Sequence, residues 1–318
     1  MHTPRLLTLL TAAALAVGHA AALGAQRPRD RDRDRDRDYD DEQVASRIDT
    51  TVAFSRGGIV DLSLVSGEIV VTGWERNEAR VNAYSEHGIL RLDVSGSRLT
   101  LDVERRRGMG DTRYEVTVPV GARLLMRSTS GDLSARGVKG EVELRTVSGD
   151  VQVEDAGPLT FETVSGEANL RGVTGGVRGS TVSGEIDLDG ITGDVDVQST
   201  SGSITMDRAQ SKVVQAETVS GEVTYDGTID PSGRYEFNSH SGEIRLVLPA
   251  NVGARLGVET FSGEIDSDFP LTLDPDRRGR DRPMRMEFTL GGGGARITAQ
   301  TFSGSITLER AGTAGERR

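Results

Sequence analysis

The chain has 318 residues with 38 basic and 49 acidic side chains, which give a formal net charge of −11. This acidic balance argues against nucleic acid as a partner, because binding to polyphosphate needs a basic surface. The sequence has no cysteine, which excludes disulfides, thiol catalysis and cysteine-ligated zinc. Its 40 glycines and its low aromatic content of 4% favour a core of small β-branched side chains between many turns.

The chain begins with the pattern of a secretory signal peptide. Arg5 precedes an apolar run from Leu6 to Val17, and small residues follow, so we expect cleavage after Ala22 or Ala25. We assign residues 1–25 to this signal peptide and expect an exported protein, in the periplasm, at the cell surface or secreted. The apolar run is short for a bilayer span, although a retained anchor is the alternative, and no transmembrane span is expected in the mature chain.

Charged residues dominate the segment 27–42, in which arginine and aspartate alternate from Arg29 to Asp38. These residues have almost nothing apolar to bury, so the loss of chain entropy on folding is not offset, and we predict a disordered tether over residues 26–43. Docking of this segment to charged envelope polymers is the alternative. The alternating signs nearly cancel, which weakens long-range attraction.

Residues 44–127 alternate apolar and polar side chains, which is typical of half-buried strands, but they lack a short repeat. We expect an N-terminal β cap here, because the end of a stacked fold must be covered. Its only tryptophan, Trp74, is expected in the core of the cap, with a sugar-stacking role as the alternative. The segment from Tyr114 to Gly121 predicts a strand and a turn that lead into the following repeats.

A Ser-Gly pair recurs along the chain. From Gly131 to Gly263 its glycines are 18, 17, 18, 18, 19, 21 and 21 residues apart, and the last step of 41 is about two periods. Short apolar–polar alternation follows each pair and each half-period, so residues 128–310 predict an all-β fold, a β-solenoid of stacked coils with two short strands per coil. A three-faced coil is the alternative, which the half-period of about nine residues disfavours. The turn glycines are Gly67, Gly131, Gly149, Gly166, Gly184, Gly202, Gly221, Gly242, Gly263 and Gly304.

Stacked coils would align three rows of side chains beside these turns. The residues two before each serine form a hydroxyl row, expected to hydrogen-bond along the stack and close turns, with matching to ice or a glycan as the alternative. The residues one before each serine, from Thr129 to Phe302, are expected to face inward, with larger side chains in the longer late coils. The hydroxyl row is Ser128, Thr146, Thr163, Thr181, Ser199, Thr218, Ser239, Thr260 and Thr301.

An acidic residue follows most of the turn glycines. We expect a solvated edge that discourages sideways aggregation, and a ladder of divalent-cation sites is the alternative, since Ca²⁺ takes several oxygen ligands. The candidate ligands are Asp132, Asp150, Glu167, Glu185, Glu222, Glu243 and Glu264.

Catalytic signatures are missing from the sequence. After the signal peptide only His87 and His240 are histidines, and no His-Glu-x-x-His, Gly-x-Ser-x-Gly or cysteine nucleophile occurs. The serines are copies of one turn, whereas a nucleophile is singular. We predict no enzyme, no catalytic residue, no cofactor and no metal site. A polysaccharide-active enzyme is the alternative, and its groove could form only at the charged insertion of residues 274–285. We otherwise expect this insertion to be a mobile surface loop. Residues 311–318 are expected to be a frayed tail.

Four segments together resemble a known family. They are Ser-Gly-Glu-Ile-Val-Val-Thr-Gly-Trp at 66–74, Val-Pro-Val-Gly at 118–121, the repeated Thr-Val-Ser-Gly-Glu/Asp, and the ending at 291–308. The chain resembles, over roughly residues 48–309, the bacterial putative-adhesin family of β-strand-repeat proteins, a domain of unknown function related to the head domain of putative autotransporter adhesins. The resemblance implies a β-solenoid and an envelope or surface location, and it supplies no catalytic residue.

These observations predict an exported, non-enzymatic β-solenoid. Its repetitive surface would serve adhesion to, or binding of, an envelope or extracellular polymer or protein. The alternative function is a periplasmic structural or sensory envelope scaffold that binds no external target.

Overall fold

The structure is a computed structural model that describes residues 45–105, 110–270 and 284–312, and every helix or strand assigned in these ranges is a β-strand. None of these residues belongs to a helix that could span a membrane. The expected signal peptide and tether lie outside the described residues, as do residues 274–283 of the charged insertion and 313–318 of the tail. The all-β fold is confirmed. The described residues all belong to one compact unit.

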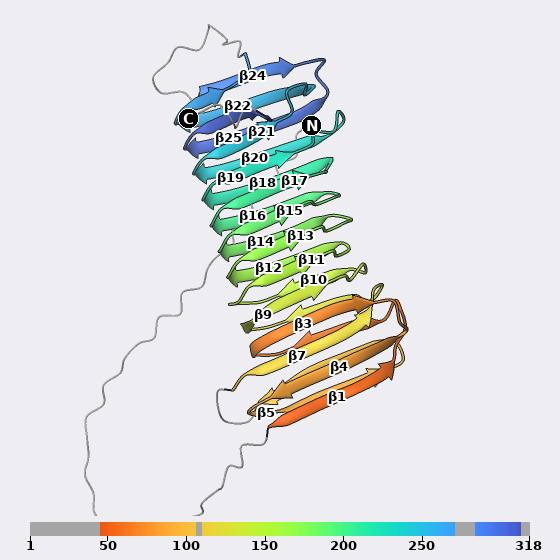
Figure 1. Ribbon diagram of the computed structural model, residues 1–318. Helices are drawn as coiled ribbons and strands as arrows, with labels where there is room; N and C mark the ends of the chain where they lie inside the picture. Colours follow the sequence, from red (N-terminus) through yellow and green to blue (C-terminus); the bar gives the residue numbers. More distant parts are fainter. Residues whose placement is uncertain (1–44, 106–109, 271–283, 313–318) are drawn as a thin grey trace, which may run out of the picture. The chain divides into compact units, whose positions relative to one another are not determined.

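The strands form two sheets of 13 strands each, stacked in rows from β1 in orange to β24 in blue (Figure 1). The first sheet has the order β1 (Ser46–Ala53), β4 (Glu78–Ser85), β7 (Thr112–Pro119), β3 (Ser66–Trp74), β9 (Ser130–Arg136), β11 (Val151–Glu154), β13 (Ala168–Arg171), β15 (Ile186–Asp189), β17 (Ile204–Ala209), β19 (Val223–Gly227), β21 (Ile244–Leu248), β26 (Ile306–Arg310) and β23 (Ile265–Ser267).

The second sheet faces the first across the core. Its order is β24 (Met284–Leu290), β22 (Ala254–Ser262), β25 (Ala295–Ser303), β20 (Arg234–Ser241), β18 (Val213–Ser220), β16 (Val195–Ser201), β14 (Val177–Ser183), β12 (Leu159–Ser165), β10 (Val142–Arg145), β8 (Arg123–Arg127), β2 (Ile59–Ser63), β6 (Arg98–Arg105) and β5 (Gly88–Ser95).

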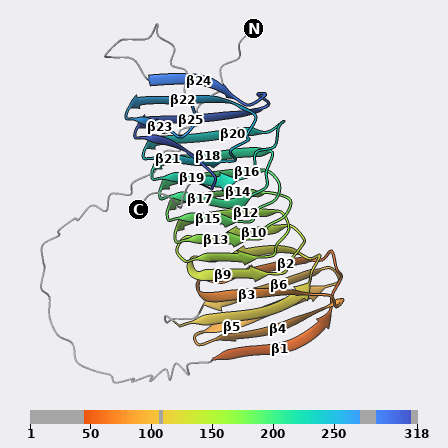
Figure 2. The ribbon, with the colours of Figure 1, turned by 45° about the horizontal axis from the view of Figure 1, so that its top comes forward.

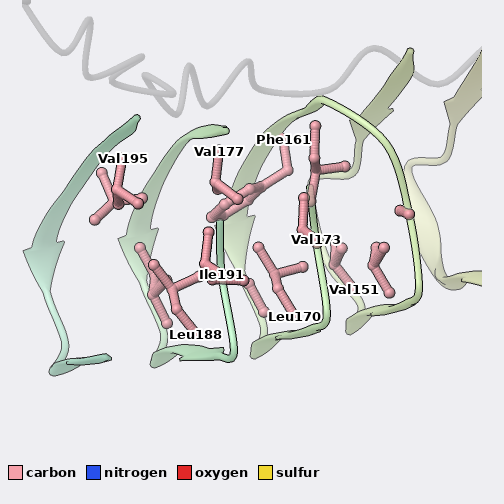
Figure 3. Close-up of a cluster of buried hydrophobic side chains, with 14 of the residues drawn as sticks. Val151, Phe161, Leu170, Val173, Val177, Leu188, Ile191 and Val195 are labelled. Atoms are coloured by element: carbon pink, nitrogen blue, oxygen red, sulfur yellow. The ribbon is translucent and has the colours of Figure 1, made fainter. Parts of the chain in front are cut away.

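In the middle of the unit, from β8–β9 to β20–β21, each coil contributes one strand to each sheet. Successive coils pair in parallel, so that Leu159, Val177 and Val195 occupy equivalent positions. Figure 3 shows the consequence: side chains such as Leu170 from the first sheet and Phe161 from the second meet in one thin core. This arrangement confirms the β-solenoid with two short strands per coil, because one coil alone could not cover its apolar face.

The C-terminal end does not follow chain order. After β20–β21 the chain forms β22–β23 one place further out, and β24 then pairs antiparallel with β22. The chain returns through β25–β26, which occupies the vacant place between the two earlier coils (Figure 2). The step of 41 residues between Gly263 and Gly304 therefore contains the capping strand and a return, and the last coil in sequence is not the last in space.

The N-terminal end is reordered in the same way. The coil β2–β3 lies between β6–β7 and β8–β9, and Gly67 on β3 is opposite Gly131 on β9. Antiparallel strands complete this end, with β5 on β6 and β4 on β7, and β1 pairs with β4. One coil inside the segment expected to be a cap thus has the same register as the repeats.

The expected orientation of the row directly before the serines was wrong. The hydroxyl row faces inward, with Thr218 only 5% exposed, whereas the row expected inside faces water, with Val219 48% exposed. The alternation of each second-sheet strand continues up to its turn, so the residue before the serine falls on the outer face. Five of the nine inward hydroxyls donate to a carbonyl oxygen of the neighbouring turn, as from Thr218 Oγ1 to Gly202 O at 3.2 Å. The other four are buried without a hydrogen-bond partner among the described residues, and they belong to Ser128, Thr163, Thr181 and Ser199.

Candidate binding edge

The turn that connects each second-sheet strand to the next first-sheet strand forms one continuous edge of the stack. From Thr129 onward each turn exposes the residue before the serine and the serine itself, and in most turns an acidic residue follows the glycine. Eight large hydrophobic side chains are exposed among the described residues, and six of them belong to this edge. We call these six the apolar row: Val147, Val164, Val182, Val219, Phe261 and Phe302, each 45–53% exposed.

Three rings stack at the C-terminal end of the apolar row. Phe302 lies between His240 and Phe261, with ring centroids 5.0 Å and 4.9 Å apart and planes within 8° and 3° of parallel. The insertion of β25 between β20 and β22 produces this order, because residues 240 and 261 would be direct neighbours if the coils followed the chain. The facing surfaces of the rings cover one another, so a ligand would meet mainly their edges.

The ten turn glycines allow adjacent coils to approach closely. A Cβ added at any of them would lie within 2.4 Å of a carbonyl oxygen in the adjacent coil. Gly202 shows the general case, with a φ of +155° and an added Cβ only 2.0 Å from Gly184 O. These glycines are therefore required for the stack itself, and they leave the neighbouring valine, serine and acidic side chains to carry any binding.

The acidic row is partly engaged by the protein itself. Asp132 Oδ1 accepts the backbone N–H of Asp150 at 2.9 Å, and Asp150 Oδ1 accepts that of Glu167 at the same distance. Arg245 lies 3.5 Å from Glu222 and 3.1 Å from Glu243. Within the described ranges no group of three or more His, Cys, Asp or Glu side chains is placed to hold a metal ion. The ladder of divalent-cation sites stays an untested alternative.

Buried tyrosines add hydrogen bonds without acid–base chemistry. Burial, reinforced by Asp102, raises the pKa of Tyr114 well above its usual value, and burial does the same for Tyr225. Both phenols stay protonated and donate to backbone carbonyls, that of Tyr225 to Thr228 O at 2.9 Å. They stabilise the core and offer no catalytic proton.

The other aromatic candidates of the sequence are also placed. Trp74 is half-buried, its Nε1 donates to Glu78 O at 2.7 Å, and the Arg76 guanidinium lies 5.0 Å from the ring centroid. The guanidinium thus covers one face of the indole ring. His87 lies beside the β4–β5 turn, and His240 belongs to the aromatic stack.

The orientation of the apolar row could have been found in the sequence. In β12 the inward residues Leu159, Phe161 and Thr163 share one parity, which leaves Val164 on the outer face. Hydrophobicity suggested the opposite, because a valine beside a threonine is usually the buried one of the two. Parity along the strand is the stronger signal wherever a strand continues into a turn without a bulge.

Comparison with known proteins places the fold in a family. The sequence profile of the Toastrack DUF4097 family matches residues 120–190 and 176–309, together more than half of the 318 residues. The chain belongs to this family. The match to Toastrack DUF4097 thus covers the middle coils and the reordered C-terminal end.

Two solved structures are similar to this Toastrack chain at low sequence identity. A putative cell adhesion protein from Clostridium sporogenes is 9% identical, with 83% of this chain and 99% of that chain covered and a TM-score of 0.27. A putative adhesin from Bacteroides fragilis is 12% identical, with 82% and 96% covered and a TM-score of 0.37. No match was found among curated proteins.

Proposed function

We propose that this protein is an exported, non-enzymatic binding protein whose apolar row contacts an envelope or extracellular polymer or protein, as an adhesin does. The observation that carries this proposal is the concentration of six of the eight exposed large hydrophobic side chains in one line. Contiguous exposed apolar surface favours association, because contact with a partner removes it from water.

The fold itself does not need apolar residues in this row. Thr129 and Thr200 occupy the same position in two other coils, so a polar β-branched side chain fits the turn equally well. Valine or phenylalanine in the other positions adds exposed apolar area without adding core. Repetition at the spacing of neighbouring strands, about 4.8 Å, would let several weak contacts act together.

Matched substitutions test the role of the apolar row. The triple variant Val164→Thr, Val182→Thr and Val219→Thr keeps side-chain shape and should unfold at the same temperature as the unmodified protein. We expect its binding to isolated cell envelopes to weaken at least about tenfold, about 1.4 kcal/mol. Val213→Thr is the control, because Val213 is 43% exposed on the same sheet but outside the row. Equal binding by the triple variant and the unmodified protein would refute the proposal.

Location distinguishes an adhesin from the alternative, a periplasmic scaffold. We would add protease to intact cells that express the tagged full chain, with cells whose outer membrane has been permeabilised as the control. Digestion on intact cells supports adhesion at the surface. Protection until permeabilisation would favour the scaffold and direct the search to a partner within the envelope.

A further inference from the structure

Three arginines align on the outer face of the second sheet at its C-terminal end. Arg234 on β20 is opposite Arg296 on β25, which is opposite Arg255 on β22. All three side chains are exposed. We call them the arginine row; it brings three positive charges to adjacent parallel strands of a protein whose formal net charge is −11.

The arginine row lacks the counter-charges that other arginines on this face have. Arg178 lies 3.3 Å from Asp196 on the next strand, and Arg123 lies 3.3 Å from Glu141. In the part of the chain that the structure describes, no ion pair involves any member of the arginine row. Like charges directly opposite each other on adjacent strands repel, and a bound anion would relieve this repulsion.

A groove of about 470 Å³ lies beside two members of the arginine row, over β22, β24 and β25. Its floor contains Gly257, which faces outward between Arg255 and Glu259. A Cβ added to Gly257 would meet nothing within 4 Å, and its φ is not in the left-handed region. Among the described glycines it alone combines these two properties with a position inside a strand.

Nothing in the chain's own packing therefore requires glycine at this position. Glycine inside a strand weakens the strand, and it is typical of places where a ligand or another backbone approaches closely. Gly179, another glycine inside a strand, shows the contrast. A Cβ there would lie 1.9 Å from the Phe161 ring, so the packing of the core requires glycine at that position. At Gly257 the missing side chain only keeps the groove open.

The remaining lining residues define the chemistry of a ligand. Thr298 and Gln300 offer neutral hydrogen-bonding groups, and Glu259 and Glu287 offer carboxylates on the same surface. Arg285 also lines the groove and forms an ion pair with Glu287 at 2.6 Å, so it is not a free cation. A densely charged polyanion would be repelled by these carboxylates. A sugar that bears one oxyanion suits the groove better, because guanidinium groups bind carboxylate or phosphate and Glu259 accepts hydrogen bonds from hydroxyls.

We propose that the groove over Gly257, together with the arginine row, binds an anionic saccharide, a sugar residue that carries a carboxylate or a phosphate. The groove has the volume of a small-ligand site. This site differs from the apolar row, and the proposal does not require the apolar row to bind anything. Unpaired arginines and an otherwise unexplained strand glycine converge on the same surface.

Calorimetric titration of the full chain tests the proposal. The probes are tetragalacturonate for carboxylates and a phosphorylated mannan oligosaccharide for phosphates, with neutral maltotetraose as the control. Binding of either anionic probe, without binding of maltotetraose, supports the proposal, and the preferred probe identifies the source of the oxyanion. Binding of neither probe, or equal affinity for maltotetraose or a single-stranded DNA oligonucleotide, would overturn it.

Two kinds of variant locate the binding. Arg255→Gln and Arg296→Gln should each weaken binding at least about tenfold, whereas Arg178→Gln, which alters a paired arginine on the same face, should leave it unchanged. Gly257→Val should abolish binding by filling the groove while the unfolding temperature stays equal or rises. Retained affinity in Gly257→Val would contradict the site. The threonine variants of the apolar row should bind these probes normally, which separates this outcome from that of the proposed function.

Discussion

The middle coils and the reordered C-terminal end use the same turn but produce different surfaces. In the middle, each coil pairs with the coils immediately before and after it in sequence, so residues that become neighbours are about one period apart in the chain. At the C-terminal end, Thr301 Oγ1 reaches Gly242 O across 59 residues of sequence, because β25 inserts beside β20. Non-local pairing brings together side chains that the period alone keeps apart.

This difference locates the specific chemistry of the molecule. The valines of the middle coils form an apolar line that Thr200 interrupts, whereas the C-terminal end adds an aromatic stack, three unpaired arginines and a groove. The aromatic stack and the arginines need β20, β25 and β22 as neighbours, in that order. The groove needs β25, β22 and β24 as neighbours. A solenoid can therefore gain a distinctive site by changing the order of its coils while retaining its repeat.

Deletions should show the largest contrast between the two regions. Removal of residues 185–202, one middle coil of 18 residues, joins Gly184 to Ser203 and restores the same register. We expect a folded protein with a cooperative unfolding transition. Removal of residues 295–318 takes away β25–β26 and should unfold β22–β24, because their pairing partners are lost. Hydrogen exchange measures both outcomes, and a well-protected β22 in the second deletion would contradict the inserted coil.

A turn glycine and the groove glycine should respond oppositely to alanine. Gly202→Ala forces a Cβ against Gly184 O at a φ of +155°, and should lower the free energy of unfolding by about 3 kcal/mol. Gly257→Ala meets no atom within 4 Å and should leave stability unchanged or raise it by about 0.5 kcal/mol. Denaturant titration checks both values. Similar losses at the two sites would mean that Gly257 is structural.

The two rows beside the turn should differ in their tolerance of valine. Thr218→Val removes a buried hydroxyl and leaves Gly202 O without that donor, which should cost about 1–2 kcal/mol of unfolding free energy. Thr200→Val, one row outward, should change stability by less than about 0.5 kcal/mol. Thermal unfolding of the two variants measures the difference, and the reverse ranking would restore the orientation first expected from the sequence.

The smallest effect concerns charge on the outer face of the first sheet. Burial raises the pKa of Asp187, and Glu167 and Asp207 raise it further. A carboxyl whose pKa is raised on folding favours the folded state while protonated and loses that contribution as pH rises through the raised pKa. Asp187→Asn should therefore raise the unfolding temperature near pH 7, and this advantage should disappear toward about pH 3. An advantage that persisted at acid pH would assign the effect to packing.

The sequence predicts the middle coils well because their information is local. The Ser-Gly period, the alternation around Val177 and Val195, and the need for glycine at the turns are sufficient for the strand pairing. The ends could not be predicted in the same way. Nothing local to Gly304 indicates that its turn contacts Gly242 and Gly263 on opposite sides, because that choice depends on which coil leaves an unpaired edge.

The candidate sites follow the same division. The apolar row was visible as a pattern, but its exposure depended on strand parity, which hydrophobicity concealed. The arginine row could not be found by any spacing rule, since Arg234, Arg255 and Arg296 are 21 and 41 residues apart and become neighbours in a different order. Only the strand order reveals that these charges share one surface.

Engineered cysteines test the central claim, the insertion of β25 between β20 and β22, most directly. The chain has no native cysteine, so each pair reports one contact. The double variant His240→Cys with Phe302→Cys should form a disulfide on oxidation, because these positions are direct neighbours, whereas His240→Cys with Phe261→Cys should not, because β25 separates them. Mass spectrometry of the oxidised proteins gives the answer. A disulfide in the second pair and none in the first would mean that the coils follow chain order, and would remove the arginine row and the aromatic stack together.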